Sequence, residues 1–113
     1  MAQLALAQRI YRQTCFHAQQ AAEKALKALL LTRHGTYPRT HSLEDLLAFD
    51  TSGELSELEE ACQRLSQFYL TTRYVDAVPG GVMDEISDED ARTSLADATN
   101  IVTSVRGRVT GRP

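Results

Sequence analysis

Basic and polar side chains recur along one side of the first predicted helix. They are spaced four, three, four and three residues apart: Gln13, His17, Gln20, Lys24 and Lys27. Lysine is a flexible point charge and histidine a titratable donor, so Lys24 and His17 can contact an anionic ligand. The alternative is a solvated face on which Glu23 and Lys27 form an i,i+4 ion pair. We favour the solvated face for Lys27 and leave both interpretations open for Lys24.

A second candidate group lies where the helical pattern stops, over residues 71–86, which we predict to form an irregular loop. Arg73 can pair bidentately with a phosphate, and Tyr74 can stack on a base. Alternatively, Arg73 and Asp76 tie the loop to a helix end by buried hydrogen bonds. His41 stands next to a predicted helix start, where it can help bind an anion or act as a packing residue.

Several other site chemistries are excluded by spacing. No Glu-x-x-His pair exists for a di-iron bundle, and no Cys-x-x-Cys pair for zinc. Cys15 and His17 are two apart on a helix and point away from each other, which argues against a thiol–imidazole pair. Pro79-Gly80-Gly81 lacks the lysine and the following helix of a phosphate loop. We therefore expect no metal and no bound cofactor.

Apolar stripes at helical period predict the elements that position these residues. The first covers about residues 10–33, with residues 1–8 also helical and a break near Gln8 and Arg9. Its apolar stripe is Tyr11, Cys15, Ala18, Ala22, Ala25 and Leu29. Gly35 ends this helix. The second helix starts near Ser42 and ends by residues 50–53.

Two further helices follow. The third buries one stripe: Leu55, Leu58, Cys62, Leu65 and Tyr69. Ser87 and the acids after it form an N-terminal cap for the last helix, which Gly107 closes. The last helix is expected to bury Ala91, Leu95, Ala98, Val102 and Val105. The expected fold is an all-α, antiparallel four- to five-helix up-and-down bundle, one domain over residues 1–113 with a frayed tail at 106–113.

Composition favours a cytoplasmic globular protein. The chain has 113 residues, 42% hydrophobic and 24% charged, and two cysteines are too few for a disulfide scaffold. No run approaches the ~18 apolar residues of a membrane span. Charge is uneven, because residues 1–41 hold six basic and one acidic side chain, whereas residues 42–91 hold two and thirteen. The basic part can face nucleotide or RNA, or the acidic segments of its own fold or of a second subunit.

Three motifs in order resemble the HEPN domain family (higher eukaryotes and prokaryotes nucleotide-binding domain). They are FHAQQAAEKALKALL over residues 16–30, PRTHSL over 38–43 and YLTTRYVDA over 69–77. Val75 stands where the family typically has proline. The resemblance implies a helical bundle, commonly a homodimer, often encoded beside a minimal nucleotidyltransferase in toxin–antitoxin pairs or related systems.

The resemblance also implies two kinds of activity. Some HEPN proteins are metal-independent ribonucleases that use an arginine, four to six residues, then histidine across a dimer interface; others bind nucleotides or serve as partner subunits. Here the only such spacing joins Arg12 to His17, and the two side chains point roughly 140° apart on a straight helix. No histidine follows His41.

We therefore expect a non-catalytic HEPN module that pairs with a nucleotidyltransferase and has a nucleotide near Lys24, Arg73 and Tyr74. The alternative is a HEPN ribonuclease toxin acting on RNA through Arg12 and His17, or through Arg39 and His41. A third hypothesis is simple RNA binding through the basic first helix and the tail arginines: Arg106, Arg108 and Arg112.

Overall fold

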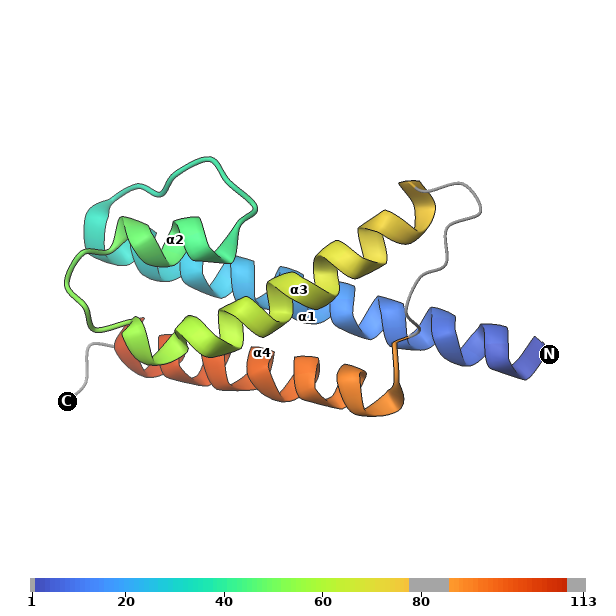
Figure 1. Ribbon diagram of the computed structural model, residues 1–113. Coiled ribbons are helices and arrows are strands. Elements are labelled where there is room, and N and C mark those ends of the chain that lie inside the picture. The colour runs from blue at the N-terminus through green and yellow to red at the C-terminus, as the bar shows by residue number, and fades with distance from the viewer. Residues whose placement is uncertain (1, 78–85, 110–113) are drawn as a thin grey trace.

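The structure, a computed structural model, describes the backbone of residues 2–77 and 86–109, and side chains over 6–68 and 86–109. These parts form an all-α bundle, as predicted (Figure 1). The elements are α1 (Ala2–His34), α2 (Leu43–Phe49), a 3-10 turn η1 (Ser56–Leu58), α3 (Glu59–Ala77) and α4 (Asp88–Val109). None of the helices in the described segments has the length and apolar character needed to cross a bilayer.

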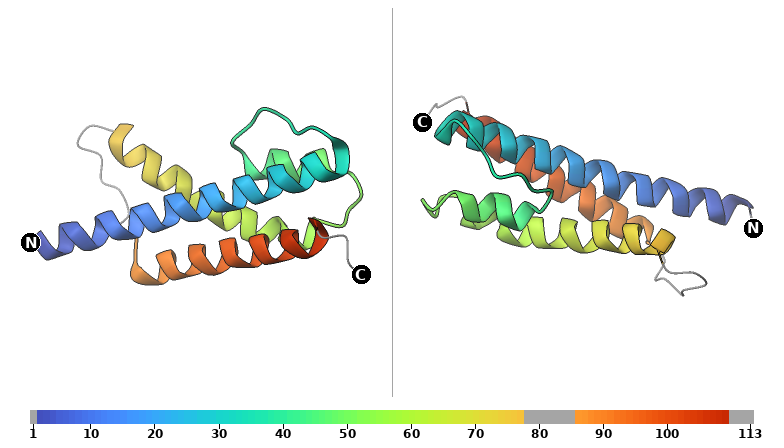
Figure 2. Two further views of the ribbon diagram at one scale, coloured as in Figure 1. Left: turned by 180° about the vertical axis from the view of Figure 1, so that it is seen from behind. Right: turned by 90° about the horizontal axis from the view of Figure 1, so that it is seen from above.

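The helices do not simply alternate in direction. α1 and α4 run the same way, since Gln8 contacts Ile86 and Cys15 contacts Ser94. The segment 35–42 doubles back along α1, so α2 also runs with α1, and α3 alone runs against them (Figures 1 and 2). The returning segment is the physical reason. A tight turn after α1 would make α2 antiparallel to α1, but here the segment 35–42 runs antiparallel instead, and α2 reverses once more and runs parallel to α1.

The core is built from small and medium apolar side chains of all four α-helices and η1. α1 supplies a buried apolar side, and Leu26, Leu29 and Leu30 are fully buried on it. The other members of this cluster are Ala18, Ala22, Leu43, Leu46, Leu55, Leu58, Ala61, Cys62, Leu65, Ala98, Ile101 and Val105. Alanines on α1 and α4 allow the two helix axes to approach closely.

Both predicted serine caps are confirmed. Ser42 Oγ accepts from Asp45 N at 3.2 Å and begins α2. At α4, Asp90 N donates to Ser87 Oγ at 2.9 Å and Ser87 N donates to Asp90 Oδ2 at 3.1 Å, which is a reciprocal capping box. The expected break near Gln8 is wrong, because α1 is one continuous helix through that position.

The predicted irregular loop is wrong over residues 71–77. α3 continues to Ala77, and Arg73, Tyr74 and Asp76 are therefore helical residues. No glycine or proline interrupts residues 59–77, so nothing in this segment breaks a helix. The rest of that loop lies outside the described residues.

Two expectations about α4 are also corrected. Leu95 is 56% exposed and Val102 half-buried, and the buried stripe instead comprises Ala91, Ser94, Ala98, Ile101 and Val105. Both stripes have helical spacing, so only packing against α1 and α3 decides between them.

The end of α4 differs as well. Gly107 does not close the helix, which continues to Val109, so the start of the predicted frayed tail is helical. Arg108 holds this last turn, because its guanidinium contacts Glu57 and donates from Nε to Ser104 Oγ at 3.2 Å. These contacts offset the cost of about 1 kcal/mol of a glycine inside a helix. Residues 110–113 lie outside the description.

Candidate functional site

A buried carboxylate joins α1 to the segment that precedes α2. Glu23 is 5% exposed, and its Oε2 accepts from Lys27 Nζ at 2.8 Å and from His41 Nδ1 at 3.0 Å. One turn earlier, Gln19 Nε2 donates to the backbone oxygen of His41 at 3.3 Å. We call these four residues the Glu23 cluster. It fixes where the returning segment crosses α1.

The electrostatics of the Glu23 cluster favour an ionised carboxylate. Burial raises the pKa of Glu23, but the hydrogen bonds and charges of Lys27 and His41 outweigh it and the pKa is lowered overall. Glu23 Oε1 and Gln19 Oε1 are buried without a hydrogen-bond partner in the part of the chain with described side chains. A buried acceptor left unpaired costs about 1–3 kcal/mol, so both oxygens are suited to a water molecule or a ligand's N–H group.

The predicted binding residues divide into two groups. The His41 side chain is 80% exposed at the edge of the Glu23 cluster, and Lys24 is exposed on the next position of α1. Both side chains are therefore at the surface, but consecutive positions of a helix point about 100° apart, so Lys24 faces away from Glu23, which His41 contacts. Arg73, Tyr74 and Asp76 belong to the last turns of α3, and their side chains lie outside the described residues. Their convergence with Lys24 remains a prediction.

A groove that was not predicted lies between α1 and α4. It measures about 640 Å³ and has small side chains, including Ala18, Ala21 and Thr99, beside large exposed ones such as Ile10 and Leu95. In the view from behind, α1 and α4 lie in front of α3 (Figure 2, left). Leu95 and Val102 were the available signal in the sequence, but their apolar side chains at helical spacing predicted burial in the core.

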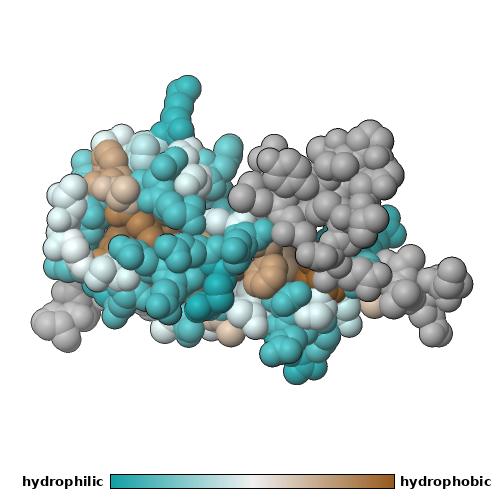
Figure 3. All heavy atoms as spheres, in the orientation of Figure 1, coloured by the Kyte–Doolittle hydropathy of each residue, from teal (hydrophilic) through white to brown (hydrophobic). Residues whose placement is uncertain are grey.

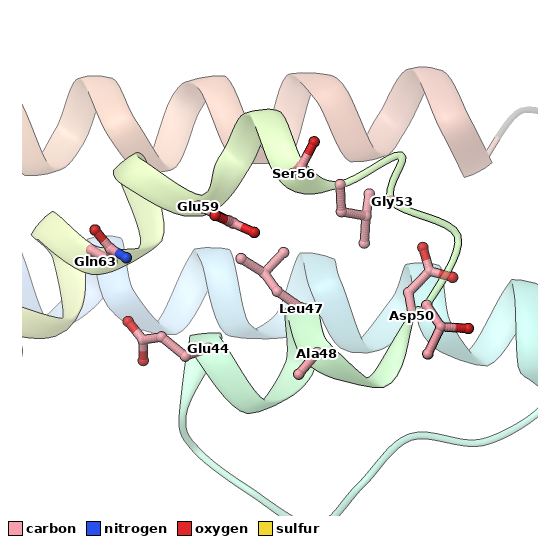
Figure 4. Close-up of a pocket in the computed structure, with 10 residues that line it drawn as sticks. Glu44, Leu47, Ala48, Asp50, Gly53, Ser56, Glu59 and Gln63 are labelled. Atoms are coloured by element: carbon pink, nitrogen blue, oxygen red, sulfur yellow. The ribbon is translucent and has the colours of Figure 1, made fainter.

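A second pocket of about 390 Å³ opens between α2 and the start of α3 (Figure 4). Glu44, Asp50 and Glu59 contribute carboxylates to its wall around Leu47, and Figure 3 shows apolar surface framed by hydrophilic atoms at this end. The described residues contain no group of three or more His, Cys, Asp and Glu side chains placed to bind a metal ion.

Asp50 in this pocket is already engaged. Its Oδ2 accepts from Arg33 Nη1 at 3.0 Å and from Ser52 Oγ at 2.8 Å, and its Oδ1 lies 3.2 Å from His34 Nε2. Burial alone would raise the pKa of Asp50. The hydrogen bonds from Ser52 and His34 and the charge of Arg33 outweigh burial, so the pKa lies below its ordinary value. The pocket wall is therefore a structural junction between α1 and α2.

The cysteine next to this pocket is chemically quiet. Burial, and then the negative charges of Glu44, Asp97 and Glu59, raise the pKa of Cys62 to about 12. A thiol with this pKa carries almost no thiolate at neutral pH, so Cys62 is not a nucleophile here.

The model of the HEPN domain matches residues 1–108. The chain belongs to the HEPN family. No curated protein and no solved structure matches it. The match extends from α1 almost to the end of α4, and so includes both the Glu23 cluster and the α1–α4 groove.

The HEPN ribonuclease motif can be tested against the described residues. Arg12 and His17 both lie on the continuous α1, and no hydrogen bond or ion pair joins them within the described segments. His17 is exposed, with its ring 5.5 Å from that of Phe16.

The other histidines of this HEPN domain contact carboxylates. His41 binds Glu23 and His34 binds Asp50. Arg39, the arginine of the alternative pair with His41, is exposed. Among the described residues, no hydrogen bond joins either predicted ribonuclease pair, Arg12 with His17 or Arg39 with His41.

Proposed function

We propose that this HEPN chain is a non-catalytic binding module that acts as a homodimer and as the partner of a minimal nucleotidyltransferase, in a toxin–antitoxin-like system. The observation that carries the non-catalytic part is the placement of the three histidines. His34 and His41 hold buried carboxylates, and His17 points away from Arg12 on one straight helix. Membership of the HEPN family supports the proposed nucleotidyltransferase partner.

A nucleotide is the proposed small ligand, at the surface next to the Glu23 cluster. Lys24 is exposed and makes no ion pair among the described side chains, so its charge is available to a phosphate. The free acceptor atoms of Gln19 and Glu23 supply the polarity that a base amino group needs. Arg73, Tyr74 and Asp76 complete this proposed site from α3.

The two neighbouring lysines of α1 allow a matched test. Lys24→Ala should weaken binding of ATP or GTP at least about 10-fold with the melting temperature unchanged. Lys27→Ala should lower the melting temperature, because it removes the lysine that pairs with the buried carboxylate of Glu23. Calorimetric titration and thermal unfolding give both readouts. Equal nucleotide binding by the wild type and Lys24→Ala would reject the site.

Arg73→Ala separates folding from binding at the second segment. Lost nucleotide or partner binding with an unchanged melting temperature supports the proposed site. A large fall in melting temperature with binding intact at low temperature shows that Arg73 serves the fold instead.

One observation favours the ribonuclease as a second candidate. His17 and Arg106 line the same α1–α4 groove, which places an imidazole and a guanidinium on one surface. Cleavage of RNA without added metal, lost in His17→Ala and retained in Arg12→Ala, would support this candidate and reject the non-catalytic module. We expect no cleavage above background.

A further inference from the structure

The α1–α4 face carries two parallel exposed stripes. On α4 the stripe is spaced four, three, four, three and four residues apart: Asp88, Arg92, Leu95, Thr99, Val102 and Arg106. On α1 it runs through Leu6, which is 56% exposed, Ile10, which is 50% exposed, and His17. Leu95 and Val102 are the apolar members of the α4 stripe, and exposed apolar residues on an outer helix face are typical of a surface that packs against a partner. Small side chains line the groove that lies between the two stripes.

We infer that a second copy of this chain docks on this face with its α4 antiparallel to α4. This inference rests on the homodimer of the proposed function and names its surface. A two-fold axis near residue 97 places Leu95 of each copy over the apolar middle of the other.

Charge decides the orientation. The first turn of α4 is acidic, with Asp88, Glu89 and Asp90, and its last turn is basic, with Arg106 and Arg108. An antiparallel pair sets Asp88 opposite the partner's Arg106 at both ends, whereas a parallel pair sets like charges side by side. Arg106 makes no ion pair among the described side chains, whereas Arg108 is held by Glu57. Asp88 is paired with Arg92 of its own helix in an exposed ion pair at 2.5 Å, so in the dimer it lies between Arg92 and the opposite Arg106.

The size of the face is sufficient. A helix of 22 residues such as α4 is about 33 Å long, and two adjacent helices are about 20 Å wide. The face is then roughly 660 Å², near the ~800 Å² per partner of a standard interface.

Leu95→Glu tests the surface with Leu31→Glu as the matched control. Both leucines are more than half exposed, at 56% and 53%, but Leu31 does not line the groove. By light scattering at about 20 μM, the wild type and Leu31→Glu should be dimers and Leu95→Glu a 12.5 kDa monomer with unchanged circular dichroism.

Charge reversal tests the orientation. Asp88→Arg and Arg106→Glu should each weaken the dimer at least about 10-fold, and the double variant should restore it. Failure of the double variant to recover, with each single variant folded, would reject the antiparallel arrangement.

The remaining outcomes separate this inference from the proposed function. A monomeric wild type would overturn both the surface and the homodimer. A dimer unaffected by Leu95→Glu would overturn the surface and leave the homodimer standing. If Leu95→Glu instead abolished binding of a co-expressed nucleotidyltransferase while the dimer persisted, the face would belong to that partner and the inference would be wrong.

Discussion

The two sides of α1 are held by different physics. Toward α2, buried polar groups set the contact, with Glu23 bound to His41 and Asp50 bound to Arg33 and His34. Toward α4, small apolar side chains make most of the contact. The hydrogen bonds described on this side are a weak one between the Cys15 and Ser94 side chains at 3.4 Å and two between Gln8 and the backbone of Ile86, just before α4.

The α2 side of α1 therefore fixes one placement of its neighbour, whereas the α4 side holds its neighbour mainly through the area that is covered. Directed hydrogen bonds admit one placement of the returning segment 35–42, whereas apolar contact is nondirectional and proportional to the area covered. Among the described side chains, the buried polar atoms on the α2 side therefore have hydrogen-bond partners within one chain, apart from two oxygens. The α4 side retains an exposed apolar edge that a second surface can cover.

The apolar side should give the largest loss of stability. Leu29→Ala removes a fully buried side chain and should lower the free energy of unfolding by about 3 kcal/mol, through lost burial and the cavity left behind. Leu31→Ala, two residues along the same helix and 53% exposed, should change it by less than about 0.5 kcal/mol. Urea unfolding compares the two variants, and similar losses would contradict the assignment of the two sides.

The polar side should give the next largest effect. Asp50→Ala leaves Arg33 with Glu54 and His34 without its carboxylate, and we expect a loss of about 2 kcal/mol. Glu60→Ala is the control, because its ion pair with Arg64 is exposed and 4.0 Å long. A loss below about 0.5 kcal/mol for Asp50→Ala, measured by urea unfolding, would mean that the junction adds little to stability.

Acid should weaken the polar side selectively. The pKa values of Glu23 and Asp50 are lowered from 4.5 and 3.8, so their contribution is complete above those values and is lost as pH falls through the lower folded values. Urea unfolding between pH 7 and pH 3 should show this decline. The double variant Glu23→Gln with Asp50→Asn should show a flatter pH dependence, and an unchanged slope would contradict the role of these carboxylates.

The smallest effect concerns the two thiols. Burial raises the pKa of Cys15, and the pKa of Cys62 is raised to about 12, so neither should react with a disulfide reagent at pH 8 in the native protein. Both should react on unfolding in urea, and a Leu31→Cys variant should react at once as the positive control. Rapid native labelling of either cysteine would show that the α1–α4 or α3 contact opens easily.

Much of the local structure could be predicted from the sequence. Serine followed three residues later by an acid predicts a helix start, since its hydroxyl oxygen accepts from a free backbone N–H, and Ser42 and Ser87 both confirm this. The apolar spacing of α1 predicts Cys15, Ala18 and Leu29 as core residues, which they are. Of the predicted binding residues, Lys24 and His41 are both exposed, and their role in binding stays a prediction.

The wrong predictions occur where two local structures fit the sequence equally well. On α4, the spacing of Leu95 and that of Ser94 each form a helical stripe, and hydropathy prefers leucine. At residues 71–77, the absence of an apolar pattern predicts a loop, although nothing in the segment breaks a helix.

Caps, helical period and ordered motifs are local properties of the chain, so most of each helix, the starts of α2 and α4 and the family could be predicted from them. The common direction of α1, α2 and α4, the contact of Glu23 with His41 and the outward position of Leu95 could not. These facts depend on contacts between residues far apart in sequence. Such contacts form only when whole helices bury one face at the expense of another, and no local pattern specifies which face that is.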